Sequence, residues 1–168
     1  MRYLGIDPGL RITGYGCVDA ARAEPRLVEA GVFRLVSRES ETVSDRLLEL
    51  DRDLAALIER LRPKAVAVEA LFAHYKHPAT AISMGHARGV ILLAVRRASL
   101  PLVELKPNAV KKFMTGNGHA SKEQMQDAVQ ERLRLREAPD PPDVADAIAI
   151  AMCAASRAVL AVDGSGGG

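Results

Sequence analysis

Hydrophobic residues in the first half of the chain form short apolar runs and one stretch of helical periodicity. Three runs, at 2–7, 12–18 and 27–36, are separated by turn residues and predict an antiparallel meander of strands. Over 43–61 apolar residues recur every three or four positions, which predicts an amphipathic helix that Pro63 ends. The run at 65–69 is short and apolar up to its last residue, which is typical of a fully buried strand.

Helices and short runs continue to alternate in the second half. A loop at 74–78 precedes an expected helix at about 79–98, and a fifth strand follows at 101–105. Pro107 favours the first turn of a short helix that Gly116 ends, and Ser121 with Gln124 forms a capping-box pattern. After prolines near 140, a last helix is expected from 143 to about 160.

This order of elements predicts one α/β domain over residues 1–160 with a five-stranded mixed sheet flanked by helices. The strands that follow helical connections are expected to run parallel to their neighbours. The glycine-rich end of the chain predicts a flexible tail at 161–168.

Carboxylates stand at the ends of three of the apolar elements. Asp7 closes the first run, Glu69 closes the fourth, and Asp143 and Asp146 open the alanine-rich last helix. Strand ends deliver side chains to the rim of a sheet, and residues three apart share one helix face, so the four acids can converge. Oxygen ligands favour Mg²⁺ or Mn²⁺, and two such ions can clamp both oxygens of a phosphodiester displacement.

Each carboxylate also has an explanation that involves no metal. Asp7 precedes a Pro-Gly turn, and Glu69 could be the exposed end of its strand. Asp143 taken alone suits a helix N-cap, while Asp146 could pair with a base or complement the helix dipole. The four together indicate a metal-dependent site more strongly than any one of them does.

Basic residues are concentrated in the middle of the chain. Between Ala70 and Lys122 eight bases face one acid, Glu104, for a net charge of +7, so the remainder of this +2 chain carries −5. All four histidines lie in the same stretch. A basic segment beside an acidic cluster suits a polyanionic substrate, held by the bases and cut at the carboxylates, and a solvated basic face would explain the charge equally well.

Other features narrow the class of protein. The longest uncharged apolar run, at 147–155, is too short to span a bilayer, and no opening run resembles a signal peptide, which favours a cytoplasmic protein away from membranes. Cys17 and Cys153 lie in apolar stretches without metal-ligand spacing, so reduced core thiols are expected. A serine or cysteine nucleophile has no evident partner, which leaves acyl transfer little support.

Three segments complete the picture when they are taken in order. The first is Leu4-Gly5-Ile6-Asp7-Pro8-Gly9 with Thr13-Gly14-Tyr15-Gly16, the second is Val68-Glu69, and the third is Asp143-Val144-Ala145-Asp146-Ala147-Ile148-Ala149-Ile150. Together they resemble the RuvC family of Holliday-junction resolvases over almost the whole chain. The resemblance implies a ribonuclease H-like fold and a homodimer with two active sites. It also implies Mg²⁺- or Mn²⁺-dependent nicking of two opposed strands of a four-way DNA junction, with two ions per active site.

The resemblance also assigns roles to residues. Its four catalytic, metal-binding positions fall on Asp7, Glu69, Asp143 and Asp146. The DNA-binding set is Phe72 as the stacking aromatic, Lys111 and Lys122 near the scissile phosphate, and Lys106 and Lys112 as further candidate phosphate contacts. The nicks would leave 5′-phosphate and 3′-hydroxyl ends, and the implied partner is a RuvA–RuvB branch-migration complex.

Several alternatives stay open at this point. His119 could contact phosphate or be an ordinary loop histidine, and Arg88, Arg96 and Arg97 could contact DNA or flank a dimer contact. The first segment also occurs in actin-like nucleotide-binding modules, although 168 residues leave little room for their second lobe. A non-catalytic junction-binding protein of the same fold is a third class, against which the presence of all four acids argues.

Overall fold

The computed structural model describes the chain except residues 22–23, 36–41, 71–77 and 164–168, and it describes no side chains at 159–163. Its strands are β1 (Arg2–Asp7), β2 (Ile12–Asp19), β3 (Arg26–Arg34), β4 (Ala65–Glu69) and β5 (Leu102–Leu105). Its helices are α1 (Val43–Leu61), α2 (Pro78–Arg97), α3 (Pro107–Thr115), α4 (Lys122–Leu133) and α5 (Pro142–Asp163).

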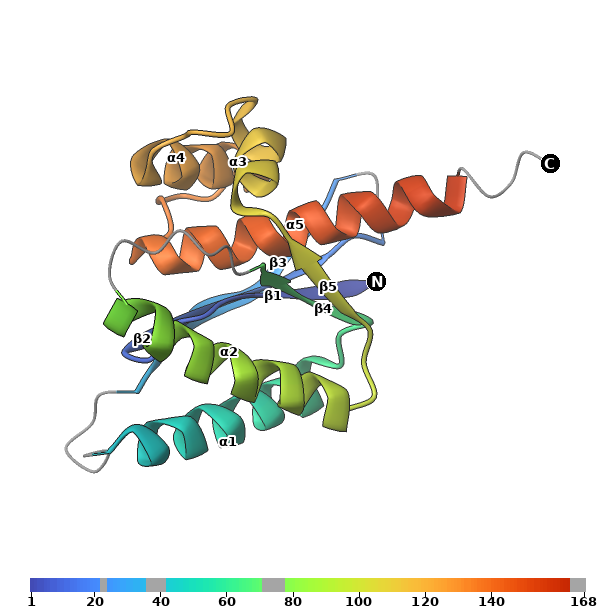
Figure 1. Ribbon diagram of the computed structural model, residues 1–168. Coiled ribbons are helices and arrows are strands. Elements are labelled where there is room, and N and C mark those ends of the chain that lie inside the picture. Colours follow the sequence, from blue (N-terminus) through green and yellow to red (C-terminus); the bar gives the residue numbers. More distant parts are fainter. Residues whose placement is uncertain (22–23, 36–41, 71–77, 164–168) are drawn as a thin grey trace.

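The strands form one mixed sheet in the order β3-β2-β1-β4-β5. The pairs β1–β2 and β2–β3 are antiparallel, whereas β1–β4 and β4–β5 are parallel. Figure 1 shows α1 and α2 on one face of this sheet and α5 on the other, with α3 and α4 outside α5. The predicted α/β class, the meander and the parallel placement of the later strands are therefore confirmed.

Alternate residues of the central strand β1 supply two separate cores. Leu4 and Ile6 point to the face covered by α1 and α2, where they join a buried cluster that includes Ile91. Tyr3 lies in the opposite cluster, beneath α5, with Ile148. The two cysteines are buried and free, and burial raises the pKa of the Cys17 thiol to about 11, as expected of core thiols.

Helix α5 lies directly on the backbone of the sheet because glycine faces it. A Cβ atom added at Gly5 would lie 2.1 Å from the carbonyl oxygen of Ala147, and one at Gly14 would lie 2.2 Å from that of Asp143. Only the absence of a side chain at these two positions permits this approach. The glycines thus set the height of α5, and of the acids on its first turns, above the sheet.

Several element ends differ from the sequence prediction by one to three residues, and three of them are informative. Strand β3 ends at Arg34 rather than at Val36, although the N–H of Leu35 still donates to the carbonyl of Arg11, opposite it in the same register. Helix α2 begins one residue early, at Pro78, a position where proline costs no helical hydrogen bond. Helix α5 runs to Asp163, three residues into the predicted tail, because good helix formers continue up to the glycines.

Candidate active site

The register of the parallel strands places two of the predicted acids at one edge of the sheet. Ile6 of β1 is the partner of Val68 of β4, and the next residues along the two strands are Asp7 and Glu69. Parallel neighbours end on the same side of a sheet, where ligand sites of α/β proteins usually lie. The side chains of Asp7 and Glu69 therefore project from the ends of two adjacent strands.

The first turns of α5 bring the other two acids to the same edge. Asp7 is paired with Gly14 of β2, and a Cβ atom built on Gly14 would lie 3.2 Å from the Cβ of Asp143. Asp146 lies one turn further along α5 and shares with Glu69 the wall of a pocket of about 170 Å³. The structure thus brings together all four acids that the sequence singled out.

The electrostatics of these carboxylates confirm their proximity. Burial, followed by the charges of Asp146, Glu69 and Asp143, raises the pKa of Asp7 well above its ordinary value of 3.8. Burial and the charge of Asp146 raise the pKa of Glu69 to about 7. The pKa of Asp146 is raised as well, chiefly by burial. The cluster thus holds more negative charge than its surroundings neutralise.

Two of the predicted lysines approach this cluster from the outer helices. Lys111, half-buried on α3, lines the same pocket as Glu69 and Asp146 and lowers the pKa of both carboxyl groups. Lys122, the first residue of α4, lowers the pKa of Asp7 and Asp146. These two lysines offset part of the repulsion and leave cations beside the acids.

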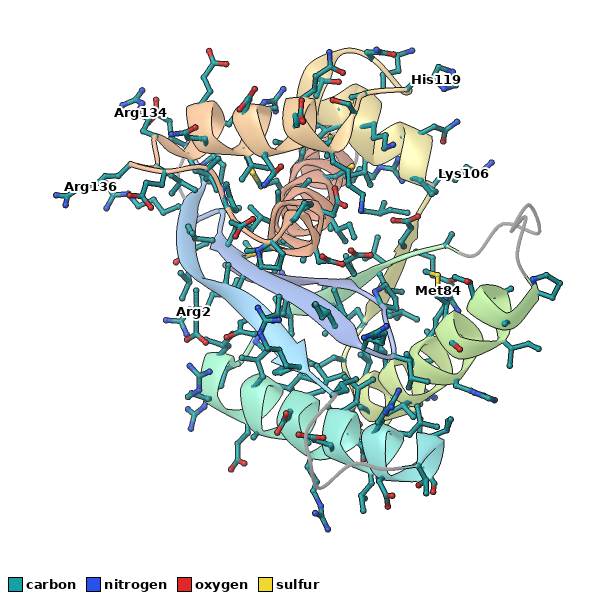
Figure 2. The ribbon with its side chains drawn as sticks, turned by 90° about the vertical axis from the view of Figure 1, so that its left-hand side faces the viewer. Arg2, Met84, Lys106, His119, Arg134 and Arg136 are labelled. Carbon is teal, nitrogen blue, oxygen red and sulfur yellow. The ribbon has the colours of Figure 1, made fainter. Side chains whose placement is uncertain are left out.

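The other predicted DNA contacts are less directly connected with the acids. Lys106 is exposed at the N-cap of α3, and Lys112 is exposed in the last turn of that helix. Figure 2 shows Lys106 and His119 on the same side of the molecule as Met84, with Arg134 and Arg136 on the opposite side. His119 is exposed, and its backbone N–H donates to the side chain of Asn117. Phe72 lies outside the described residues.

The donor set suits a hard divalent cation. Four carboxylates supply only oxygen, and a divalent ion would relieve the mutual repulsion that, after burial, raises the pKa values of Asp7, Glu69 and Asp146. Among the residues that the structure describes, no three acidic, histidine or cysteine side chains are arranged as a finished ligand cage. The residues therefore fit Mg²⁺ or Mn²⁺ through the chemistry of their oxygen donors and through their convergence at one edge of the sheet.

Sequence reasoning missed two residues that hold the strand ends. Thr13 is fully buried, and its hydroxyl accepts from the Gly9 N–H and donates to the Gly9 carbonyl, closing the turn after Asp7. Arg88 of α2 donates to the carbonyl of Glu69 and pairs with Glu104. The signal for Arg88 is an arginine in the middle of an otherwise apolar stretch of helix, a residue for which the sequence left DNA and dimer contacts open.

A mixed five-stranded sheet with carboxylates on its two central strands and on the helix that crosses it is the ribonuclease H-like arrangement of nucleases. The family model of crossover junction endodeoxyribonuclease RuvC matches residues 3–154. The chain therefore belongs to the RuvC family.

Individual relatives and a solved structure agree with this assignment. The chain is 49% identical over 152 residues to crossover junction endodeoxyribonuclease RuvC of Rhodopirellula baltica, covering 89% of this chain and 83% of the relative. It is 46% identical over 158 residues to the RuvC of Chloroflexus aggregans, covering 94% of each. The structure of T. thermophilus RuvC in complex with Holliday junction substrate superposes with a TM-score of 0.86 at 35% identity, covering 96% of each chain.

Proposed function

We propose that this protein is a structure-specific endonuclease that resolves Holliday junctions by paired, metal-dependent nicks in opposed strands during recombination and DNA repair. The convergence of Asp7, Glu69, Asp143 and Asp146 at one sheet edge is the observation that carries this proposal. Membership of the RuvC family supports the junction as substrate.

The four carboxylates would hold Mg²⁺ or Mn²⁺, two ions per active site. Such ions supply an ionised water at neutral pH and stabilise charge on the leaving oxygen. Because a ligand carboxyl must be ionised, Glu69, with its pKa of about 7, would have to be deprotonated to hold such an ion near neutral pH.

The remaining residues of the site orient the DNA strand. Lys111 and Lys122 lie beside the acids and attract the scissile phosphate by charge. Lys106, Lys112 and Phe72 are proposed as further DNA contacts. In the reaction a water gives up a proton to solvent as its oxygen bonds to phosphorus, the bond from phosphorus to the 3′-oxygen breaks, and that oxygen takes a proton from solvent. The products are 5′-phosphate and 3′-hydroxyl ends.

Two opposed nicks require two active sites, and α2 supports a homodimer. This helix leaves Ile82 and Leu93 60% and 55% exposed, although it buries Ala87 and Ile91 against the sheet side of the molecule. By length and apolar composition alone α2 could also cross a membrane. Its buried Arg88 ion pair instead fits a helix of the protein interior whose second face meets another subunit.

The family resemblance adds a RuvA–RuvB branch-migration complex as partner. The sequence adds a cytoplasmic location and a single nuclease domain, predicted over residues 1–160, whose last helix α5 runs to Asp163. The matching of the family model up to residue 154 supports the domain assignment.

Substitution of Asp7 by asparagine tests the catalytic assignment. Asp7→Asn should abolish Mg²⁺-dependent nicking of a synthetic four-way junction and leave binding of the junction in chelator intact. Asp127→Asn, on the exposed face of α4, is the matched control and should cut at the wild-type rate. Wild-type cutting by Asp7→Asn would refute the assignment.

The same assay separates the other classes of function. Junction binding by the wild-type protein without nicking in Mg²⁺ or Mn²⁺ would favour a non-catalytic junction-binding protein. Tight binding of ATP would favour an actin-like nucleotide-binding module. Nicks in linear duplex as frequent as those at the junction would contradict structure specificity.

A further inference from the structure

A buried arginine joins three elements at the strand end that carries Glu69. Arg88 lies in the middle of α2 and is only 9% exposed. Its Nε donates to the carbonyl oxygen of Glu69 at 3.2 Å, and its guanidinium forms an ion pair with Glu104 of β5. Through this one side chain α2 is tied to β4 and to β5.

We propose that Arg88 is a positioning residue that fixes the backbone from which the Glu69 carboxylate projects. This inference rests on the proposed nuclease function, in which Glu69 is a ligand of the catalytic ions. In the proposed function α2 contributes only the dimer contact, and the role of Arg88 would connect this helix to the active site as well.

The backbone at Glu69 needs such support because the sheet holds it from one side. The pairing of β1 with β4 ends at Ile6 and Val68, one residue before Glu69. Towards β5 the ladder continues, and the N–H of Ala70 donates to the carbonyl of Leu105 at 2.8 Å. The hydrogen bond from Arg88 therefore restrains the Glu69 carbonyl where the β1 ladder no longer reaches.

Arg88 acts on the main chain rather than on the charge of the Glu69 carboxylate. Burial, Asp146 and Lys111 account for the shift in the Glu69 pKa. The guanidinium is turned instead to the carbonyl oxygen and to Glu104. An arginine can serve both because its planar fork presents Nε and Nη donors in fixed directions, which a lysine ammonium does not.

Loss of this contact should reduce turnover without reducing junction binding. Residues that orient metal ligands typically change metal affinity or activity by roughly 10- to 100-fold when they are removed. We expect Arg88→Met to lower kcat by roughly that factor, to leave KM within about twofold, and to raise the Mg²⁺ concentration needed for half-maximal rate. Arg88→Lys should recover part of kcat, because one of the two contacts can be kept.

The experiment compares full-length variants in nicking of a synthetic four-way junction over a Mg²⁺ titration, with melting temperatures measured alongside. Arg60→Met is the control, since Arg60 also joins a helix to a strand through an ion pair, with Glu29 of β3, and Glu29 is paired with Cys17, well short of the Gly14 that lies opposite Asp7. This control should lose stability with kcat and Mg²⁺ requirement unchanged. Glu104→Gln, at a half-exposed position, gives a second variant should Arg88→Met fail to fold, and it should show a smaller fall in kcat of the same kind.

Three results would overturn the inference. They are wild-type kcat in Arg88→Met, a loss that appears in KM alone, and equal losses of kcat in Arg88→Met and Arg60→Met. If Arg88→Met does not fold, wild-type kcat in Glu104→Gln would overturn it instead. Failure of the wild-type protein to nick the junction would refute the proposed function itself, and so is distinguishable from failure of the role of Arg88.

Discussion

Burial and the nearby charge of Asp146 make the ionised form of Glu69 destabilising to the folded protein at neutral pH. Its pKa is about 7 when folded, against an ordinary value of 4.5, so the folded state binds its proton more tightly than the unfolded chain does. The associated stability is fully present below the unfolded pKa and is lost as the pH rises through the folded pKa. The raised pKa values of Asp7 and Asp146 act in the same direction. The protein without bound ions should therefore lose stability as the pH rises from about 4 to above 7.

Glu69→Gln should remove part of that loss. In chelator at pH 8 we expect the variant to exceed the wild-type free energy of unfolding by about 1–3 kcal/mol, and at pH 4 we expect the difference to shrink. Mg²⁺ should stabilise the wild-type protein more than the variant, because it binds the folded state through the carboxylate. Urea unfolding at both pH values checks this, and a variant no more stable than wild type at pH 8 would contradict it.

Thr13 shows how one hydroxyl shapes the turn that follows Asp7. Its Oγ1 accepts from the Gly9 N–H at 3.2 Å and donates to the Gly9 carbonyl at 2.6 Å. Thr13→Val keeps the shape and leaves both backbone groups without that partner, which should cost about 1–3 kcal/mol in chemical unfolding. Thr13→Ser keeps the hydroxyl and should cost less. The reverse order of the two variants would show that packing of the methyl group matters more than the hydrogen bonds.

At the scale of elements, the stability of this fold depends on the close packing of α5 against the sheet. A methyl group at Gly5 would meet backbone atoms, the Ala147 carbonyl oxygen at 2.1 Å and the Ala151 nitrogen at 2.5 Å. Since α5 would have to lift, we expect Gly5→Ala to destabilise the fold by more than about 3 kcal/mol. Gly31→Ala is the control, because a methyl group there would first meet the side-chain hydroxyl of Tyr15, which can move. Equal losses in thermal unfolding would contradict this account.

The helix ends that are set by capping residues could be predicted from the sequence. Ser121 caps α4 with Gln124 in the expected reciprocal pair, and Gly116 ends α3 with a positive φ of 78°. The convergence of the acids was expected on the condition that their two strands are neighbours, and the structure meets that condition by pairing β1 with β4. The partners of Arg88 could not be predicted, since they depend on how α2 lies across β4 and β5, which no local periodicity records.

Across the whole molecule, the acids lie where the layers meet. Helices α3 and α4 carry Lys111 and Lys122 to the acids, while α2 closes the opposite face of the sheet (Figure 1). A DNA strand bound at this edge would have the two lysine side chains beside its phosphate and the four carboxylates beneath it. The fold thus brings lysines of the basic central segment next to the acidic cluster at one site, and this arrangement suits binding and cutting of a polyanion.

In the proposed function the second active site would come from another copy of the chain, and the exposed apolar face of α2 is the surface proposed for that contact. Ile82 and Leu93 are eleven residues apart, close to three full helical turns, so their exposed side chains share one face of α2. Leu93→Glu should leave the fold intact, because the side chain is already exposed, and should shift the protein from dimer to monomer in sedimentation analysis. Leu48→Glu, which changes an equally apolar residue 49% exposed on α1, should leave the dimer unchanged. Paired nicks should then give way to single, uncoupled nicks in Leu93→Glu alone, whereas a Leu93→Glu protein that stays dimeric would place the subunit contact elsewhere.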